Sequence, residues 1–529
     1  MRKTFARVLG ALLLAALSAA ALWPQAASAE GVLRIARHQD STTLDPIMTI
    51  QNADIWVMNN MNGLLVRVNR EATDVEPDLA ERWEISDDGT VYTFHLREGL
   101  KFSDGSPLTA KDAKFSLERL RDQEGSVMAS MFSIVKSIET PDDRTVVITL
   151  NQPSAPFLAS LAMFSAAVLP EKAVTAAGEE FGNNPVGAGA FMLEEWRRGE
   201  VIRLKKNPNY WEAGRVKLDG VEWYFIPNDN TRVLKLQAGE VDAIVFIPFN
   251  RVNELSGNPD LQVHLDPSTR EDHILINHAH KPLDDVRVRQ ALLHAVDRKA
   301  ILDNIMEGSA GPARGVLAPG VFGYKDMQLD KLYPFDRAKA RALLAQAGWK
   351  PGADGIMAKG AQRLSLSWLA ARGRYPKDGE ITEAIQAMFK EVGVEARVQL
   401  LEWAAVFQQV RANPLNHHMF TLGWVTSNAD ADYSLFALFH SKQVPPTGWN
   451  TSRYANARID TLVEQARRSL NQTEREKLYG EVQDILAREM VWIPVYTTKE
   501  IIASRASVKG FAVHPVEYNL ALWKTWLDR

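Results

Sequence analysis

The chain has 529 residues, enough for two or three domains, and its 61 basic and 65 acidic side chains leave a net charge of −4. A chain of this balance has no surplus of positive charge for nucleic acid or an anionic membrane, so both are excluded as main partners. Cysteine is absent. Neither disulfides nor a lipid-modified cysteine can therefore hold the protein, and a hydrophobic core must stabilise it.

The first 29 residues have the pattern of a cleavable secretory signal. Basic residues precede an apolar run at 8–22, and Ala27-Ser28-Ala29 offers a small-x-small cleavage site before Glu30. A membrane anchor is the alternative, but the run is shorter than the ~18–20 residues that span a bilayer. Together with the missing cysteine, this pattern predicts a free periplasmic protein of a Gram-negative bacterium.

Residues 76–119 contain the clearest local folding signals. Asp87, Asp88 and Gly89 predict a hairpin turn between strands at 82–85 and 91–96. Thr109 precedes Asp112 by three residues, which is an N-cap pattern for the helix that follows. A further strand pair at 137–138 and 146–150 completes an expected α+β unit over 76–184.

The rest of the chain alternates strands and helices. Strands are expected at 32–37, 191–196, 201–204, 221–226 and 241–245, with helices at 50–66 and 231–238. From 278 to 498 the alternation continues and predicts a second α/β domain. A short strand at 274–277 is expected to cross between the two domains. The glycine-rich segment 184–191 precedes a strand and lacks a phosphate-loop pattern, so a tight turn is expected there.

No motif supports catalysis: the chain has no G-x-S-x-G, no H-E-x-x-H and no cysteine. A dispersed catalytic set remains an open alternative. His417 and His418 form the only adjacent histidine pair, and neighbouring strand residues face opposite sides, so the pair is poorly arranged for one metal ion. Surface histidines are the preferred interpretation, and no metal or cofactor is predicted.

Candidate binding residues lie in the second domain. Arg372 and Arg374 follow a strand, where two guanidinium groups suit a carboxylate or phosphate, although a solvated basic loop is equally compatible. Trp424 ends a strand and enters a polar loop, the place where α/β sheets hold ligands. Trp403, on a helix, and Trp449 are candidates either for ligand stacking or for the core.

Ordered motifs along the mature chain resemble one known family. They are PDLAERW at 77–83, YTFHLREG at 92–99, KFSDGSPLTAKD at 101–112, PVGAG at 185–189, NPNYW at 207–211, AGEVD at 238–242 and DVRVRQALLHAVDR at 285–298. The chain resembles the family 5 extracellular solute-binding proteins of bacterial ABC importers, of the dipeptide and oligopeptide type.

The resemblance implies an α/β periplasmic clamshell with mixed sheets, an inserted α+β domain in the first lobe and a two-crossing hinge. Residues 1–29 would be the signal, 30–75, 185–277 and 502–529 lobe I, 76–184 the inserted domain and 278–501 lobe II. The hinge crossings would lie near Asn277 and near 498–501. A monomer would close over a small solute and deliver it to membrane permease subunits.

The ligand is where the chain departs from the family pattern. Peptide binders of this type commonly carry an aspartate at the position of Ser427 to pair with the peptide ammonium, and Asp430 is an alternative for that role. The arginine that holds the ligand carboxylate in dipeptide binders falls on Arg372. A short peptide or peptide-like carboxylate is therefore expected, with opines, amino-acid conjugates, glycosides and metal chelates as alternatives. The expected ligand-binding residues are Arg372, Arg374, Trp403, Trp424, Ser427, Asp430 and Asp432.

Overall fold

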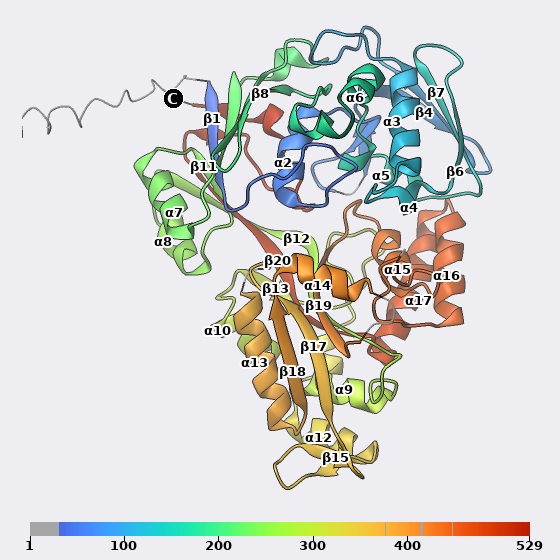
Figure 1. The fold of residues 1–529 in the computed structure, drawn as a ribbon, viewed down its shortest axis with the longest axis vertical. Coiled ribbons are helices and arrows are strands. Elements are labelled where there is room, and N and C mark those ends of the chain that lie inside the picture. Colours follow the sequence, from blue (N-terminus) through green and yellow to red (C-terminus); the bar gives the residue numbers. More distant parts are fainter. Residues whose placement is uncertain (1–30, 73, 376, 413–415, 447, 529) are drawn as a thin grey trace, which may run out of the picture.

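The computed structural model describes residues 31–72, 74–375, 377–412, 416–446 and 448–528, so the expected signal at 1–29 lies outside the described residues. The chain forms two lobes that are joined by two long strands, β12 and β20, which run diagonally between them (Figure 1). The predicted two-lobed α/β fold with mixed sheets is confirmed.

One 11-stranded sheet runs through both lobes in the order β18-β17-β19-β12-β20-β11-β1-β10-β9-β8, with β13 (Ala310–Pro312) beside β20. In lobe I, β1 pairs in parallel with both β10 and β11. In lobe II, β17 pairs in parallel with β18 and β19. The strand bounds are β1 Val32–Arg37, β8 Phe191–Arg197, β9 Val201–Lys206, β10 Gly220–Phe225, β11 Ala243–Val245, β17 Ser365–Ala371, β18 Glu395–Leu401 and β19 Met419–Val425.

The crossing strands are longer than the sequence predicted. β12 spans Leu261–Ile276 and β20 spans Trp492–Arg505, so the short strand expected at 274–277 and the crossing expected near 498–501 are parts of longer strands. The two strands pair antiparallel, with register shifts between Pro267 and Glu271 and between Asp272 and His273. Such irregularities bend a strand pair. The bend between Pro267 and Glu271 lies where β12 leaves lobe I for lobe II, several residues before Asn277.

The unit expected at 76–184 contains a four-stranded antiparallel sheet, β4-β5-β7-β6, covered by α3 (Ala110–Asp122). β4 (Ala80–Ile85) and β5 (Val91–Leu96) form the predicted hairpin, and β6 (Val135–Glu139) and β7 (Thr145–Leu150) form the second pair. The predicted N-cap is confirmed, because Thr109 and Asp112 bond reciprocally in a capping box. Tyr92, Phe94 and Leu96 face a common core.

The glycine-rich segment 184–191 is a turn pressed against the end of α2 (Asn52–Met61). A Cβ on Gly187 would lie 2.2 Å from the carbonyl oxygen of Met61, and one on Gly189 would lie 2.5 Å from its carbonyl carbon. Only glycine permits this approach. Helix α2 is shorter than the helix predicted at 50–66, since the chain turns at Gly63 towards β2 (Val66–Val68).

Helices cover the sheet of lobe II. α13 (Asp378–Glu391) packs on β17 and β18, and α14 (Trp403–Val410) lies beside β17. α15 (Ala431–Phe439) packs against α16 and α17, a helix pair that the sequence analysis did not predict. Other helices are α7 Asp229–Ala238, α9 Val286–Ala295, α10 Arg298–Asn304, α12 Arg337–Gln346, α16 Ala457–Arg468 and α17 Gln472–Glu489.

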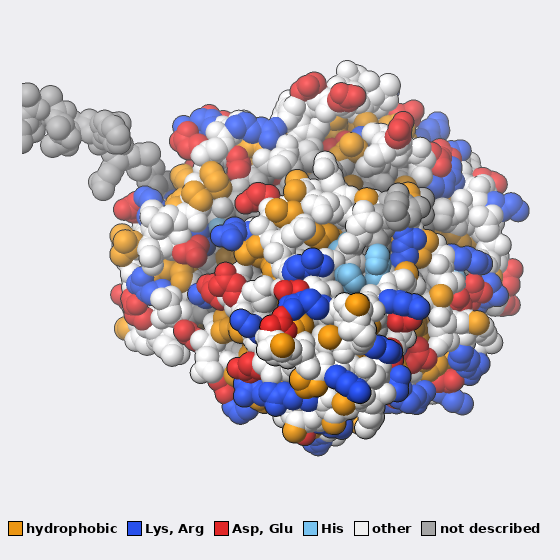
Figure 2. Space-filling view, turned by 60° about the horizontal axis from the view of Figure 1, so that its bottom comes forward, with side chains coloured by type: hydrophobic (Ala, Val, Ile, Leu, Met, Phe, Trp, Pro, Cys, Tyr) orange, Lys and Arg blue, Asp and Glu red, His pale blue; other side chains and the backbone are white. Residues whose placement is uncertain are grey.

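On the face of lobe II seen in Figure 2, basic and acidic side chains are interspersed, and histidine side chains reach the surface together at one place. Within the part of the chain that the structure describes, no helix has the length and apolar character needed to cross a membrane.

Candidate ligand-binding cleft

A cavity of about 480 Å³ lies between the lobes. Lobe I supplies Asn52, Ile55 and Tyr518, and the inserted unit supplies Phe164 and residues 126–130. Lobe II supplies the opposite wall, and Arg270 reaches it from the bend of β12. Because both lobes contribute walls, a ligand here would be enclosed by the closed form of the protein.

An aromatic wall lines the lobe II side of this central cavity. Trp403, Phe407 and Arg411 recur every four residues along α14 and its C-cap, so they share one helix face. The rings of Phe407 and Trp449 lie 5.7 Å apart, and those of Trp449 and Trp424 lie 5.5 Å apart. The indole N–H of Trp424 donates to Ser434 at 3.1 Å, which fixes the ring in place.

The charges that line the central cavity are all positive among the described residues: Arg270, Arg374 and Arg411, with no aspartate or glutamate. Arg374 lies over the ring of Trp403 at 4.8 Å, and Arg411 lies over that of Trp449 at 5.0 Å. Neither forms an ion pair with a carboxylate in the described part of the chain, whereas Arg270 is bonded to Glu517. Arg411 also donates to the backbone carbonyl oxygens of Gly448 and Pro446. The cavity therefore offers an anion the positive charges of two guanidinium groups that have no carboxylate partner among the described residues.

The pair of Arg270 and Glu517 links the lobes beside this cavity. Arg270 Nε donates to Glu517 Oε2 at 2.9 Å, a second contact joins Nη2 to Oε1, and Asn52 donates to the same carboxylate at 2.7 Å. Burial lowers the pKa of Arg270, but the charge and hydrogen bond of Glu517 and the charge of Asp272 together outweigh burial, and the net pKa is raised. Burial raises the pKa of Glu500 well above its usual value, and the neighbouring Glu517 raises it further. Both causes favour the protonated form of Glu500 beside the ion pair.

Gly423 on β19 lets three polar side chains converge behind the cavity wall. A Cβ at this position would lie 2.5 Å from Asp272 Oδ1, 2.8 Å from Tyr375 and 2.9 Å from Arg270 Nη1. Asp272 also accepts a bond from the Thr498 hydroxyl at 2.7 Å, across the two crossing strands. Burial, partly offset by Arg270, raises the pKa of Asp272 to about 6.

Four of the seven residues predicted from the sequence line the central cavity: Arg374, Trp403, Trp424 and Ser427. Arg372 is exposed and is not among the lining residues. Asp430 caps α15 and is bonded through both oxygens to Arg475, at 2.8 and 2.7 Å, so its charge is already neutralised.

Asp432, the remaining predicted residue, lies in a smaller cavity of about 70 Å³ that shares Trp424, Tyr433 and Trp449 with the central one. We call it the side cavity. Burial raises the pKa of Asp432 to about 6, with Arg467 opposing the shift and Asp430 adding to it.

A third cavity of about 510 Å³ adjoins the central one at Arg374 and Tyr375 and is also lined from both lobes. Three carboxylates line it: Asp229 and Glu380 are paired with Arg232 and Lys377 respectively, and Glu307 lines it as well. The cleft is thus positive at its centre and of mixed charge at this end.

Sequence reasoning missed Arg270, Arg411, Tyr433 and Tyr518, all of which line the central cavity. The spacing of Trp403, Phe407 and Arg411 was a usable signal for Arg411, because residues four apart share a helix face. Arg270 was hidden within Arg270-Glu271-Asp272-His273, a charged run in a buried strand.

The prediction that both histidines of the pair lie on the surface is wrong for His417, which is 4% exposed. Burial, followed by the charges of His280 and His418, lowers its pKa to about 4. The rings of His280 and His418 lie 5.3 Å apart. No group of three or more His, Cys, Asp or Glu side chains able to hold a metal occurs among the described residues.

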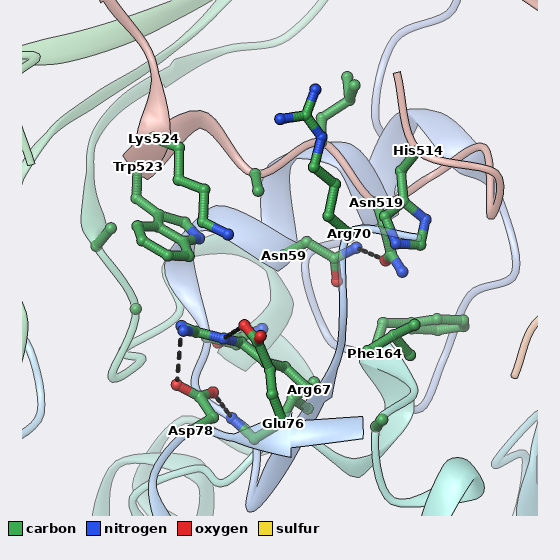
Figure 3. A pocket seen from close by; sticks show the side chains of 18 of the residues that line it. Asn59, Arg67, Arg70, Glu76, Asp78, Phe164, His514, Asn519, Trp523 and Lys524 are labelled. Carbon is green, nitrogen blue, oxygen red and sulfur yellow. Dashed lines mark hydrogen bonds and ion pairs between the residues drawn. The ribbon is translucent and has the colours of Figure 1, made fainter. Parts of the chain in front are cut away.

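A further cavity, of about 140 Å³, lies within lobe I and the inserted unit (Figure 3). We call it the lobe I cavity. Arg67 is surrounded there by carboxylates, at 2.8 Å from Glu76 and 3.7 Å from both Asp78 and Glu212. Asp78 also accepts bonds from the Leu64 N–H and the indole N–H of Trp211. Arg67 thus has carboxylate partners within this cavity, although Glu212 Oε2 makes no hydrogen bond among the described residues.

Two lobes joined by crossing strands, with a cleft lined from both sides, define a clamshell ligand-binding protein. The chain belongs to the bacterial extracellular solute-binding proteins, family 5, whose model matches residues 74–445. Members of this family are solute-binding components of ABC importers and are not enzymes, so the chain is a solute-binding component of that kind.

The relatives carry different ligands. The glutathione-binding protein GsiB of Salmonella typhimurium is 31% identical over 502 residues, which is 94% of each chain. The DppA protein of Helicobacter pylori, solved with the peptide STSA, has a TM-score of 0.81 and 30% identity over 94% of this chain and 98% of that one. AgaA of A. tumefaciens R10, solved with agropinic acid, has a TM-score of 0.80 and 27% identity over 94% and 99%.

Proposed function

We propose that the protein binds a short peptide or peptide-like solute bearing carboxylates in the central cavity and delivers it to membrane permease subunits. The observation that carries this proposal is the lining itself, in which Arg374 and Arg411 lie on aromatic rings without a carboxylate partner among the described residues. Closing the lobes over a ligand removes its charges from water, so each ligand carboxylate needs such a partner.

In this proposal, Arg374 and Arg411 hold ligand carboxylates, Trp403 and Trp424 pack against the apolar parts, and Ser427 contacts the polar backbone. Glutathione is the first solute to test, because it has two carboxylates and is the ligand named for a relative of 31% identity. The protein acts in the periplasm as a monomer after removal of its signal, and it releases its ligand chemically unchanged.

An opine is the second candidate. AgaA, at 27% identity, was solved with agropinic acid, and a cavity with arginines but no lining carboxylate suits an acid whose charge is not balanced by an ammonium group. The two candidates differ in whether a cationic group on the ligand must find a partner elsewhere in the cleft.

Native mass spectrometry of the protein released from the periplasm without denaturation tests the proposal. We expect a retained solute that carries more carboxylate than ammonium groups and returns unchanged after release. A neutral sugar or a metal chelate in the cleft would contradict it, and turnover of added peptides would contradict the absence of catalysis.

A further inference from the structure

The third cavity continues the cleft beyond Arg374 and has a volume of about 510 Å³. Lobe I lines it with residues that follow β1 and β11 and with the start of α7, and lobe II lines it with Glu307 and with residues around the start of α13. Small-ligand pockets in proteins measure about 300–1,000 Å³, so this volume can hold part of a ligand. Because Arg374 and Tyr375 line both this cavity and the central one, a ligand in the central cavity can extend into it.

Among the described residues, two charged side chains of the third cavity lack a charged partner. Arg232 and Lys377 each form an ion pair with a carboxylate of the same cavity. The side chains of Glu307 and Arg374 form neither an ion pair nor a hydrogen bond within the described part of the chain. The cleft therefore presents an unpaired negative charge at Glu307 as well as the unpaired positive charge at Arg374.

A ligand can reach the carboxylate of Glu307, because this residue is exposed in the loop between α10 and β13. Lys499 approaches the loop, but its Nζ donates to the backbone carbonyl of Gly308 at 2.8 Å, and it forms no ion pair in the described chain. Among the described residues the central cavity has no lining aspartate or glutamate, and both oxygens of Asp430 are bonded to Arg475. An ammonium group enclosed in the cleft needs a counter-charge, and Glu307 is the lining carboxylate that has none of its own among these residues.

Strained backbone is concentrated around the third cavity. Phe246, Glu307 and Lys377 have positive φ angles of 56°, 49° and 58°, and all three line it. They come from three separate segments, and only five other non-glycine residues of the described chain have a positive φ. Such conformations cost free energy for residues other than glycine, and they cluster at ligand sites. This concentration favours a lining that is shaped for a ligand.

The lobe I wall of the third cavity includes two aromatic rings, those of His38 and Phe246, which lie 4.4 Å apart in an edge-on arrangement. Burial, followed by the charge of Arg232, lowers the pKa of His38 to about 4, so its imidazole is neutral at neutral pH. A neutral aromatic wall does not repel a cation, and the faces of aromatic rings attract one.

We propose that the third cavity binds an ammonium group of the ligand through Glu307, while Arg374 holds a carboxylate of the same ligand. The ligand is then an extended zwitterion that lies across the junction of the two cavities. This inference rests on the proposed function for the carboxylate on Arg374, and it selects the peptide-like candidate over an acid that has no ammonium group.

Calorimetry with glutathione and glutaryl-Cys-Gly tests the ammonium site, because the second compound keeps both carboxylates and lacks only the ammonium group. We expect the wild type to bind glutathione at least tenfold more tightly than glutaryl-Cys-Gly, and Glu307→Gln to bind the two compounds alike. Glu383→Gln is the control and should keep the preference, since Glu383 is exposed on α13 and lies outside the lining. A merely structural role of Glu307 would change both affinities and leave their ratio as in the wild type. A Glu307→Gln protein that keeps the preference, or a wild type that has none, would overturn the ammonium site and leave carboxylate binding intact.

The solute retained by protein released from the periplasm without denaturation gives a test that assumes no ligand. Reductive methylation, which modifies amines, should raise the mass of the released solute, and Glu307→Lys should retain less than a tenth of the wild-type amount. A retained carboxylate without an amine would overturn the ammonium site and leave the proposed function standing. If the wild type retains no solute and binds neither glutathione nor glutaryl-Cys-Gly, the proposed function and the ammonium site both fail.

Discussion

The central cavity and the lobe I cavity both contain arginines beside aromatic rings, but they differ in how the charges are matched. Arg67 in the lobe I cavity lies over Trp523 and among three carboxylates. Arg374 and Arg411 lie over Trp403 and Trp449 with no carboxylate bound to them in the described residues. Arg67 already has carboxylate partners within the protein, whereas Arg374 and Arg411 have positive charges that a ligand carboxylate can pair with.

This difference separates a structural charge network from a binding site. A buried ion pair is part of the folded structure. Removing one partner destabilises the fold, because the other charge then stays buried without a counter-charge. A cation that lines an enclosed cleft without a carboxylate partner is paired with an anion only when an anionic ligand binds. Variants of the two cavities should therefore affect different measurements.

The largest effect is expected for Arg67→Met. Removing this guanidinium leaves Asp78 buried without its main counter-charge, and burial already raises the pKa of that carboxyl despite Arg67. We expect the free energy of unfolding in urea to fall by about 3–5 kcal/mol. Arg82→Ala is the matched control, because the Arg82–Glu84 pair is exposed and should contribute less than about 1 kcal/mol. An Arg67 variant as stable as that control would contradict the structural role of the lobe I cavity.

Arg374→Ala should weaken the binding of an anionic ligand by about 2 kcal/mol or more, as expected when an enclosed charge loses its partner. The free energy of unfolding without ligand should change little, since no ion pair is lost. Calorimetry and urea unfolding of the same preparation measure both quantities. A large loss of stability with unchanged affinity would place Arg374 with Arg67 as a structural residue.

The pH dependence sharpens the comparison at the hinge. Burial, offset in part by Arg270, raises the pKa of Asp272 to about 6 from its ordinary value of 3.8, so the native state binds more protons than the unfolded state between these values. The contribution of Asp272 to stability is therefore present below about pH 4 and is lost as the pH rises through about 6. Asp272→Asn should gain about 2–3 kcal/mol relative to wild type between pH 4 and 7.5. Parallel stability profiles for the two proteins would contradict this assignment.

The smallest effect is expected for Arg372→Ala. Its side chain is exposed and lies outside the lining of the cleft, so stability and affinity should each change by less than about 0.5 kcal/mol. The comparison of Arg372 with Arg374, two residues along the same loop, thus tests the geometry of the cavity. A loss of affinity equal to that of Arg374→Ala would mean that the loop places both arginines on the ligand.

The elements of the fold that were predicted from the sequence are those with strong local sequence signals. The hairpin of β4 and β5, the capping box at Thr109 and the start of α14 follow from turn residues, caps and periodicity. The long crossing strand β12 was not predicted in full, because Asp266, Arg270 and Glu271 look like a loop until partners from distant parts of the chain are known. Glu517, which neutralises Arg270, is 247 residues away.

The same limit applies to the binding residues. Trp424 and Ser427 were predicted from their place after a strand, and both line the central cavity. Asp430 had the same sequence context, but Arg475 from α17 occupies both of its oxygens. Whether a charged residue is free for a ligand depends on which distant side chain packs against it, and this information is absent from local sequence.

The central claim is that the arginines of the cleft bind the ligand's carboxylates, and a calorimetric titration with glutathione and its diethyl ester tests it most directly. We expect glutathione to bind the wild type and Arg372→Ala equally, the Arg374→Ala/Arg411→Ala variant to lose at least 100-fold in affinity, and the ester to bind weakly to all three. An ester that binds the wild type as tightly as the acid, or a double variant that keeps full affinity for glutathione, would contradict the claim.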